Sequence, residues 1–183
     1  MSGGEPVTIL TRMCTSLDGY VTTPDGWPVQ LAFPGWDAGA LGYYDLQDRC
    51  DAVVMGRVTF EPALSAPHWP WGDLPVYVLG SHRPEGTPDG VIVDEDPARL
   101  LERLREASTG ADVHLVGGPQ TVETFHALGA LDELRVMVLP MLGGSGRRLS
   151  PELGPGTALS LVGTTIWPAG VVEIVYEPES DRP

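Results

Sequence analysis

The sequence has 183 residues, of which 42% are hydrophobic and 20% are charged, and this balance is typical of a globular domain large enough to bury a core. The formal net charge of −14 argues against nucleic-acid and membrane partners, because phosphate backbones and anionic lipids repel so acidic a surface. All 11 basic residues are arginine, which excludes Schiff-base catalysis and a P-loop, since both need a lysine.

Eight short apolar runs predict β-strands at residues 7–14, 52–55, 76–79, 91–93, 113–116, 134–139, 158–165 and 170–176. Helices are expected at residues 37–49, 58–63, 97–106 and 121–128. Leucines three and four residues apart mark the third helix, which follows the cap candidates Asp94 and Asp96 and has Pro97 in its first turn. Strands that alternate with helices predict a mostly parallel sheet, and the tight turn at 167–170 predicts a C-terminal antiparallel hairpin.

A single domain is expected over residues 1–183, with an ordered core from about residue 7 to residue 176. Residues 1–6 and the acidic tail from Glu177 lack an apolar pattern and are expected to fray. The chain does not open on a signal-peptide pattern, and no apolar run approaches the roughly 18 residues of a transmembrane helix. The two cysteines, Cys14 and Cys50, do not suggest a disulfide framework. A cytoplasmic protein is therefore expected.

Two proline-rich stretches, 22–36 and 62–75, predict long loops of the kind that form lids or binding walls. These loops contain four of the five tryptophans, namely Trp27, Trp36, Trp69 and Trp71. One interpretation is a flat aromatic wall against a substrate, with Trp27 and Trp36 as the substrate-binding candidates. The other is that these side chains pack in a core or an interface.

Three turns that follow predicted strands carry residues suited to phosphate. Residues 56–59 join a glycine to an arginine and a threonine, 81–83 group a serine, a histidine and an arginine, and 117–121 place two glycines before a helix. Each turn alone also fits an ordinary tight turn or a solvated loop. Together they fit a dinucleotide better, because the carboxyl ends of parallel strands meet at one edge of a sheet. The cofactor-binding candidates in these turns are Gly56, Arg57, Val58, Thr59, Leu79, Ser81, His82, Arg83, Val116, Gly117, Gly118, Pro119, Gln120 and Thr121.

Six motifs follow one another along the chain: SLDGYV at 16–21, MGRVTFE at 55–61, LGSHRP at 79–84, VGGPQ at 116–120, LGALDEL at 128–134 and PMLGGSG at 140–146. The first four, in this order, resemble the dihydrofolate reductase family. The last two resemble its riboflavin-biosynthesis branch, the C-terminal reductase domain of the bifunctional deaminase–reductase, rather than folate-reducing enzymes. The resemblance covers nearly the whole chain, from about residue 7 to residue 176.

The resemblance implies a dihydrofolate reductase-like, three-layer α/β fold with a mixed, mostly parallel sheet of about eight strands and an antiparallel C-terminal hairpin. It implies an NADPH-dependent reductase that transfers hydride to a C=N or C=O group of a small substrate, linked to a pterin, a pyrimidine or a sugar. It also implies a homodimer.

Specific roles follow from the same resemblance. Residues 56–59 and 117–121 would hold the pyrophosphate, and residues 81–83 would recognise the adenosine 2′-phosphate, which favours NADPH over NADH. A cis peptide would join Gly117 to Gly118. Asp18, Gly19 and Tyr20 match the segment beside the nicotinamide.

The sequence departs from the folate-reducing pattern at the acid that anchors the pterin. Asp37 is the nearest candidate for this acid. The proton that a reduction needs could come from water or from a catalytic acid such as Asp18 or Asp37, although Asp18 could instead bond its own turn at Gly19. The four histidines lack metal-ligand spacing, so no metal site is expected. Two alternatives stay open: a nucleotide or small-molecule binding module that reduces nothing, and a flavin-binding reductase.

Overall fold

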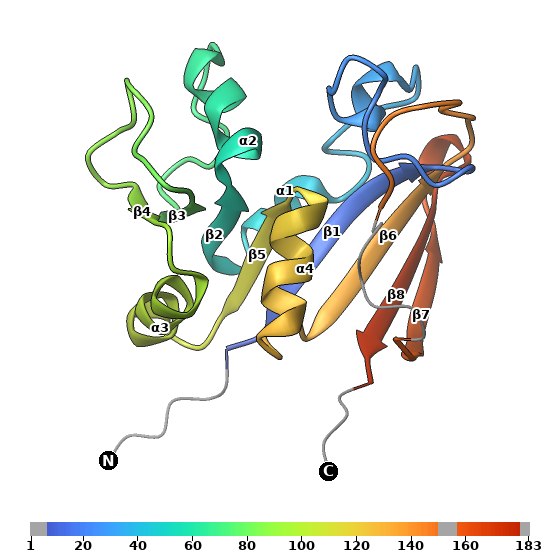
Figure 1. Cartoon of the computed structure of the whole chain (residues 1–183). Coiled ribbons are helices and arrows are strands. Elements are labelled where there is room, and N and C mark those ends of the chain that lie inside the picture. The colour runs from blue at the N-terminus through green and yellow to red at the C-terminus, as the bar shows by residue number, and fades with distance from the viewer. Residues whose placement is uncertain (1–6, 150–156, 180–183) are drawn as a thin grey trace.

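An eight-stranded mixed sheet forms the centre of the protein in the computed structural model, which describes residues 7–149 and 157–179 (Figure 1). Across the sheet the strands follow the order β4-β3-β2-β5-β1-β6-β8-β7. All neighbouring strands from β4 to β6 pair in parallel, and β8 runs antiparallel to both β6 and β7. The bounds are β1 Ile9–Ser16, β2 Cys50–Gly56, β3 Val76–Leu79, β4 Ile92–Asp94, β5 Asp112–Gly117, β6 Glu133–Leu139, β7 Leu159–Ile166 and β8 Val172–Pro178. The predicted fold class is confirmed.

Four α-helices connect the strands in the described residues: α1 Tyr43–Gln47, α2 Arg57–Phe60, α3 Pro97–Ala107 and α4 Pro119–Ala127. Three 3-10 segments accompany them, η1 Val29–Ala32, η2 Glu61–Ser65 and η3 Pro168–Gly170. The start of α3 is fixed by Asp96, whose carboxylate accepts the backbone N–H groups of Ala98 and Arg99. Asp96 is therefore the cap, and Asp94, the other candidate, makes different contacts.

The helices and loops cover both faces of the sheet, which gives three layers. Met13 of β1 packs in a cluster with Leu104 of α3 and Phe125 of α4. Its neighbour Cys14 points to the opposite face, where it joins a second cluster with Tyr43 of α1. This alternation is the period of two expected for a strand between two layers.

The structure differs from the sequence prediction at several element ends. The helix expected at 37–49 is limited to α1, because residues 37–42 form turns and Gly42 has a φ of +67°. The helix expected at 58–63 is the single turn of α2 followed by η2. The predicted tail begins too early, since Glu177 and Pro178 still pair with β7. The prediction for residues 1–6 lies outside the described residues.

The strand β7 lies at one open edge of the sheet, opposite the edge strand β4. Nearly every residue of β7 is exposed, including Leu161, Val162 and Ile166 with exposed fractions of 61%, 53% and 83%. Among the described residues, no helix is long and apolar enough to cross a membrane.

Candidate functional site

The candidate site lies at the edge where the parallel strands end. The central strand β2 ends at Gly56, and its two neighbours, β3 and β5, end at Leu79 and Gly117. Gly56 pairs with Leu79, and Met55 pairs with Gly117. The three predicted turns therefore leave the sheet side by side (Figure 1).

The first and third turns are in close contact. A Cβ atom on Gly56 would collide with the side-chain oxygen of Thr121, and a Cβ on Gly118 would lie 3.5 Å from Oγ1 of Thr59. Position 56 has no room for a side chain, so its glycine is required by the approach of α4. The two turns bring glycine backbone together with two threonine side chains at one place on the sheet edge, Thr59 half-buried and Thr121 buried.

The first turn also touches the second. A Cβ on Gly80 would lie 3.0 Å from Cβ of Arg57, so the stem of Arg57 packs directly on the backbone that follows β3. The guanidinium of Arg57 is half-buried and donates to Glu61 at 2.6 Å, one helical turn further on. Arg57 therefore contacts the second turn from the first. Its neighbour Val58 is 62% exposed.

The third turn has the cis peptide that was expected between its paired glycines. Gly117 and Gly118 are joined by a cis peptide, as expected, and Gly117 has a φ of +116°, a region that favours glycine. Gly118 is the N-cap of α4 and Pro119 is its first residue. Val116 is half-buried in β5 and Gln120 is exposed in the first turn of α4.

The helix dipole supports anion binding at only one of the two helix starts. α4 has nine residues, so its N-terminus is a positive end that favours a phosphate. α2 has four residues, too few for a comparable dipole. Anion binding at the start of α2 therefore depends on the side chains of Arg57 and Thr59.

The second turn lines an open hollow of about 420 Å³. Ser81 and His82 are exposed, with Ser81 Oγ 3.5 Å from His82 Nδ1. Arg83 is committed elsewhere, because its guanidinium donates to the backbone carbonyls of Thr87, Pro88 and Val91. These hydrogen bonds hold the loop that follows the turn, and the phosphate-binding role expected for Arg83 stays a prediction.

Asp18 anchors a loop that the sequence places far away. Its carboxylate accepts hydrogen bonds from Ser16 Oγ at 2.6 Å and from the N–H groups of Gly143 and Gly144 at 2.7 and 2.8 Å. These hydrogen bonds lower the pKa of Asp18 to about 2, the bond from Ser16 contributing most. At neutral pH Asp18 is thus an ionised hydrogen-bond acceptor, and its contacts favour the structural interpretation over proton delivery.

The segment after Asp18 forms a tight turn. Gly19 has a φ of +87°, and its N–H bonds the carbonyl of Ser16. The ring of Tyr20 lies under the guanidinium of Arg148, whose Cζ is 4.8 Å from the ring centroid. Residues 18–20 and the 143–148 loop therefore form one unit beside the end of β1.

The remaining candidates for substrate contact, Asp37, Trp36 and Trp27, differ in exposure and in their contacts. Asp37 is exposed, and its carboxylate accepts the N–H of Ala40 in a turn. Trp36 packs edge-on against Tyr43, with ring centroids 5.2 Å apart, while Trp27 is 56% exposed.

Trp69 and Trp71 belong to a different cluster. Their ring centroids lie 5.0 Å apart, and both rings pack on Phe60. The interpretation as core packing is correct for this pair, and an aromatic wall made of all four tryptophans is not formed.

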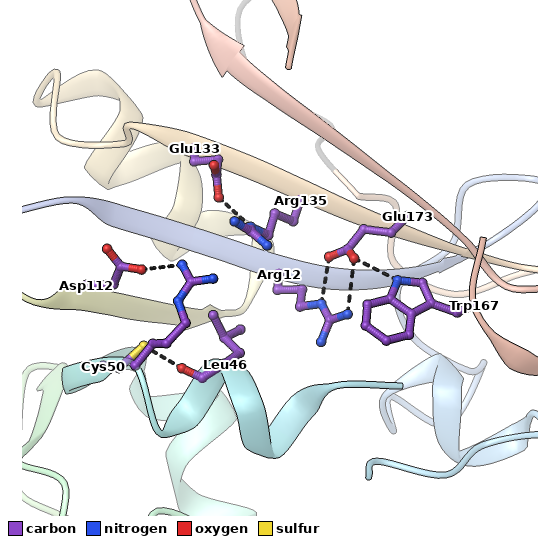
Figure 2. A network of polar contacts seen from close by, with 9 residues as sticks. Arg12, Leu46, Cys50, Asp112, Glu133, Arg135, Trp167 and Glu173 are labelled. Carbon is purple, nitrogen blue, oxygen red and sulfur yellow. Dashed lines mark hydrogen bonds and ion pairs between the residues drawn. The ribbon is translucent and has the colours of Figure 1, made fainter. Parts of the chain in front are cut away.

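Sequence reasoning missed a buried polar network on the α1 side of the sheet (Figure 2). Arg12 of β1 donates to both oxygens of Glu173 of β8, at 2.8 and 3.2 Å, and both side chains are 3% exposed. Trp167 Nε1 also donates to Glu173 at 2.7 Å, and the Arg12 guanidinium lies over the rings of Tyr43 and Trp167. The available signals were an arginine and a glutamate that each stand inside an apolar strand.

His114 of β5 lies on the same face of the sheet as Arg12. It pairs with Leu10 of β1, and Leu10 and Arg12, two residues apart on that strand, point to the same face. Burial, with smaller contributions from Arg12 and Arg135, lowers the pKa of His114 to about 4. Its Nε2 atom has no hydrogen-bond partner in the part of the chain that the structure describes. Within residues 7–149 and 157–179, no group of three His, Cys, Asp or Glu side chains could hold a metal ion.

Comparisons with known proteins agree with this geometry. The uncharacterized protein YwjB of Bacillus subtilis (strain 168) is 32% identical over 83% of this chain and 87% of its own length. The crystal structure of a putative riboflavin biosynthesis protein from Shewanella sp. PV-4 has a TM-score of 0.76 and 24% identity, covering 95% of this chain and 100% of that one. Dihydrofolate reductase from Enterococcus faecalis, complexed with NADP(H), has a TM-score of 0.67 and 17% identity, covering 94% and 97%. The model of the RibD C-terminal domain matches residues 7–172, and the chain therefore belongs to the RibD C-terminal domain family.

Proposed function

We propose that the protein is a reductase that binds NADP(H) at the carboxyl edge of the sheet and reduces a C=N or C=O group of a small pterin-, pyrimidine- or sugar-linked substrate. One observation carries the proposal: the turns after β2, β3 and β5 meet, with Gly56 against Thr121, Gly118 against Thr59 and Gly80 against Arg57. Family membership supports a reductase-like activity.

The residues present fit a dinucleotide. The glycines at the meeting point let the three turns pack closely together, and α4 offers a positive helix end there that favours a phosphate. Residues 56–59 and 117–121 would hold the pyrophosphate, and the turn after Leu79 would hold the adenosine end. The segment 18–20 would lie beside the nicotinamide. When bound, the cofactor supplies the hydride, and the protein supplies position and exclusion of water.

The proton that accompanies hydride transfer needs a separate source. Asp18 is an ionised acceptor of three hydrogen bonds, which leaves water or Asp37 as candidates in this chain. Asp37 is exposed in a loop next to Trp36. We place the substrate on this side, against Trp36 and the exposed Trp27.

The experiment is a titration of the purified protein with NADPH, followed by thermal unfolding. Saturable binding is expected, and NADPH at 100 times its Kd should add about 2.7 kcal/mol to the free energy of unfolding. Oxidation of NADPH is then followed by the loss of absorbance of its reduced nicotinamide ring, with a panel of dihydropterins, aminopyrimidines and sugar-linked pyrimidines. No saturable binding and no thermal shift would contradict the proposal.

A second candidate function, a binding module without catalysis, is favoured by the engagement of both candidate acids in loop contacts. Asp18 holds the 143–144 backbone, and Asp37 holds that of Ala40. Stoichiometric binding of NADPH without oxidation across the panel would support this second candidate. Turnover of any compound in the panel would eliminate it.

A homodimer is also proposed, through the open edge of the sheet. β7 has one paired neighbour, β8, and exposes Leu161, Val162 and Ile166, a combination that favours cover by another chain. Sedimentation at micromolar concentration should give twice the monomer mass of 19.6 kDa. A monomer under these conditions would contradict the dimer and leave the reductase proposal intact.

A further inference from the structure

The ion pair of Arg12 with Glu173 has no assigned role in the proposed reaction, although it is unusually enclosed. Both of its side chains are 3% exposed, whereas every other ion pair of the described residues has at least one partner that is far more exposed. Taking two charges out of water costs free energy, which is recovered only when their hydrogen-bonding groups are used. Any donor that this pair leaves unused therefore favours a bound partner.

The Arg12 guanidinium has one nitrogen left over. Its Nε and Nη2 atoms donate to the two carboxylate oxygens of Glu173. In the part of the chain that the structure describes, the fully enclosed side-chain atoms without a partner are Thr11 Oγ1 and His114 Nε2. Arg12 Nη1 is not one of them, and it makes no hydrogen bond to a described residue, so this nitrogen is not sealed off. In Figure 2 it lies on the side of the guanidinium away from Glu173.

Aromatic side chains fix the position of this guanidinium. Cζ of Arg12 lies 5.0 Å from the ring centroid of Tyr43 and 5.2 Å from that of Trp167. Trp167 is held in turn by its hydrogen bond to Glu173 and by its contact with Gly42, where a Cβ atom would lie 2.6 Å from the indole ring. The arginine is therefore fixed before any ligand arrives, and Nη1 is the donor that it can offer.

Arg12 lies on the strand that leads to the place proposed for the nicotinamide. Arg12 and Ser16 point to the same face of β1, about 13 Å apart along the strand, and Ser16 bonds Asp18 of the segment proposed to lie beside the nicotinamide. The half-buried rings of Trp36 and Tyr43 pack on this face. A flat heterocycle against Trp36 would thus have its hydride-accepting group near Ser16 and its buried edge toward Arg12.

The charge balance around Arg12 selects the kind of group that Nη1 can bind. Glu173 balances the charge of Arg12, and Arg135, which pairs with Arg12 across the two strands, is balanced by Glu133. The site is therefore neutral overall and disfavours an anion, which would lose its hydration without gaining a free counter-charge. A guanidinium donates hydrogen bonds and accepts none, so its partner must be an acceptor. A neutral ring carbonyl meets both conditions.

We infer that Arg12, held by Glu173 and Trp167, is a specificity-determining residue of the proposed reductase, and that its Nη1 atom donates to a ring carbonyl oxygen at the buried edge of the substrate. The substrate class is then an oxo-substituted heterocycle with a lactam or imide edge. An amino group at the same position would direct its N–H donors at those of Arg12 and leave both unpaired. The inference rests on the proposed function, because it concerns the substrate of the same site.

The test uses two pairs of compounds that share a ring system: pteridine-2,4-dione with 2,4-diaminopteridine, and quinazoline-2,4-dione with 2,4-diaminoquinazoline. The binding of NADPH is measured first and by itself. The Kd of each compound is then measured by calorimetry on the full chain saturated with NADPH. The dione of each pair should bind at least about tenfold more tightly, the lower end for a hydrogen bond to a charged donor.

A double variant tests whether Arg12 causes this preference. Arg12→Leu with Glu173→Leu removes the donor together with its counter-charge, and should abolish the difference in Kd within each pair. The matched control is Arg135→Leu with Glu133→Leu, which removes the neighbouring ion pair from β6 on the same face and should keep the preference. Circular dichroism verifies that both variants are folded.

A crystal structure of the native protein with a bound dione tests the contact without any variant, and it decides the question if the double variant does not fold. A ring carbonyl oxygen is expected at about 3 Å from Arg12 Nη1. A dione bound with its oxygens away from Arg12 would overturn the inference.

The outcomes separate the inference from the proposed function. A diamino compound that binds as tightly as its dione in the native protein overturns the inference, and so does a preference that survives the loss of Arg12. A preference lost equally in the control at positions 133 and 135 overturns it too, because any change on this face would then account for the effect. Failure of all four compounds to bind overturns the inference while the NADPH site stands. Failure of NADPH itself to bind overturns the proposed function.

Discussion

The replacement Glu173→Gln tests the buried network of Figure 2 and gives a large expected effect. Glutamine keeps the volume of the side chain and an oxygen for Trp167, but it leaves the Arg12 guanidinium without a counter-charge. Both side chains of this ion pair are 3% exposed, so water does not compensate. Removing one partner of such a pair destabilises a protein by about 3–5 kcal/mol. This is a large share of the total stability of a domain, which is roughly 5–15 kcal/mol.

Equilibrium unfolding in urea measures the effect. With an m-value of about 2 kcal/mol/M, the midpoint of the Glu173→Gln variant should fall by about 1.5–2.5 M. The matched control is Arg49→Gln, which breaks an ion pair of 2.5 Å with Asp112 whose arginine is 54% exposed. That control should lower the midpoint by less than about 0.5 M, because exposed ion pairs contribute roughly 0–1 kcal/mol.

A double replacement separates the ion pair from simple packing. Arg12→Leu with Glu173→Leu removes both charges, and buried pairs replaced in this way leave stability nearly unchanged or raise it by about 1–4 kcal/mol. The double variant should therefore be more stable than Glu173→Gln. A Glu173→Gln midpoint within the range of the Arg49→Gln control would refute the reasoning about burial.

Three further predictions concern single residues. Gly56→Ala should weaken NADPH binding at least about tenfold by displacing Thr121, whereas Gly90→Ala, which meets no atom within 4 Å, should leave it unchanged in the same titration. His114 has a pKa near 4 in the folded protein against about 6.5 unfolded, so its contribution is fully present above pH 6.5 and lost as pH falls toward 4. The free energy of unfolding should fall by on the order of 3 kcal/mol over this interval, and in His114→Gln the urea midpoint should depend less on pH. Asp18→Asn should speed hydrogen exchange in the 143–148 loop, and unchanged exchange would contradict its anchoring role.

Local patterns in the sequence account for much of the fold. The leucine spacing and Asp96 predict α3 to within one residue at its C-terminal end, because capping and amphipathicity act within a few residues. The apolar runs predict the strands with shifts of about two residues at their ends. α1 and α2 are shorter than predicted, since Gly42 and Pro62 favour turns that the helical pattern does not reveal.

The parts of the site that sequence could not predict depend on contacts between distant residues. Arg12 and Glu173 are 161 positions apart, and Asp18 meets Gly143 across 125. Nothing in the turn after Leu79 indicates that Arg83 folds back onto its own loop. The three turns themselves were predictable, because each follows a strand directly and parallel strands carry their carboxyl ends to one edge.

A crystal structure of the protein with NADPH tests the central claim most directly. We predict that the pyrophosphate lies between residues 56–59 and 117–121, with the adenosine end over Ser81 and His82. NADPH bound on another face of the sheet, or density for no dinucleotide in crystals soaked well above the Kd, would contradict the account.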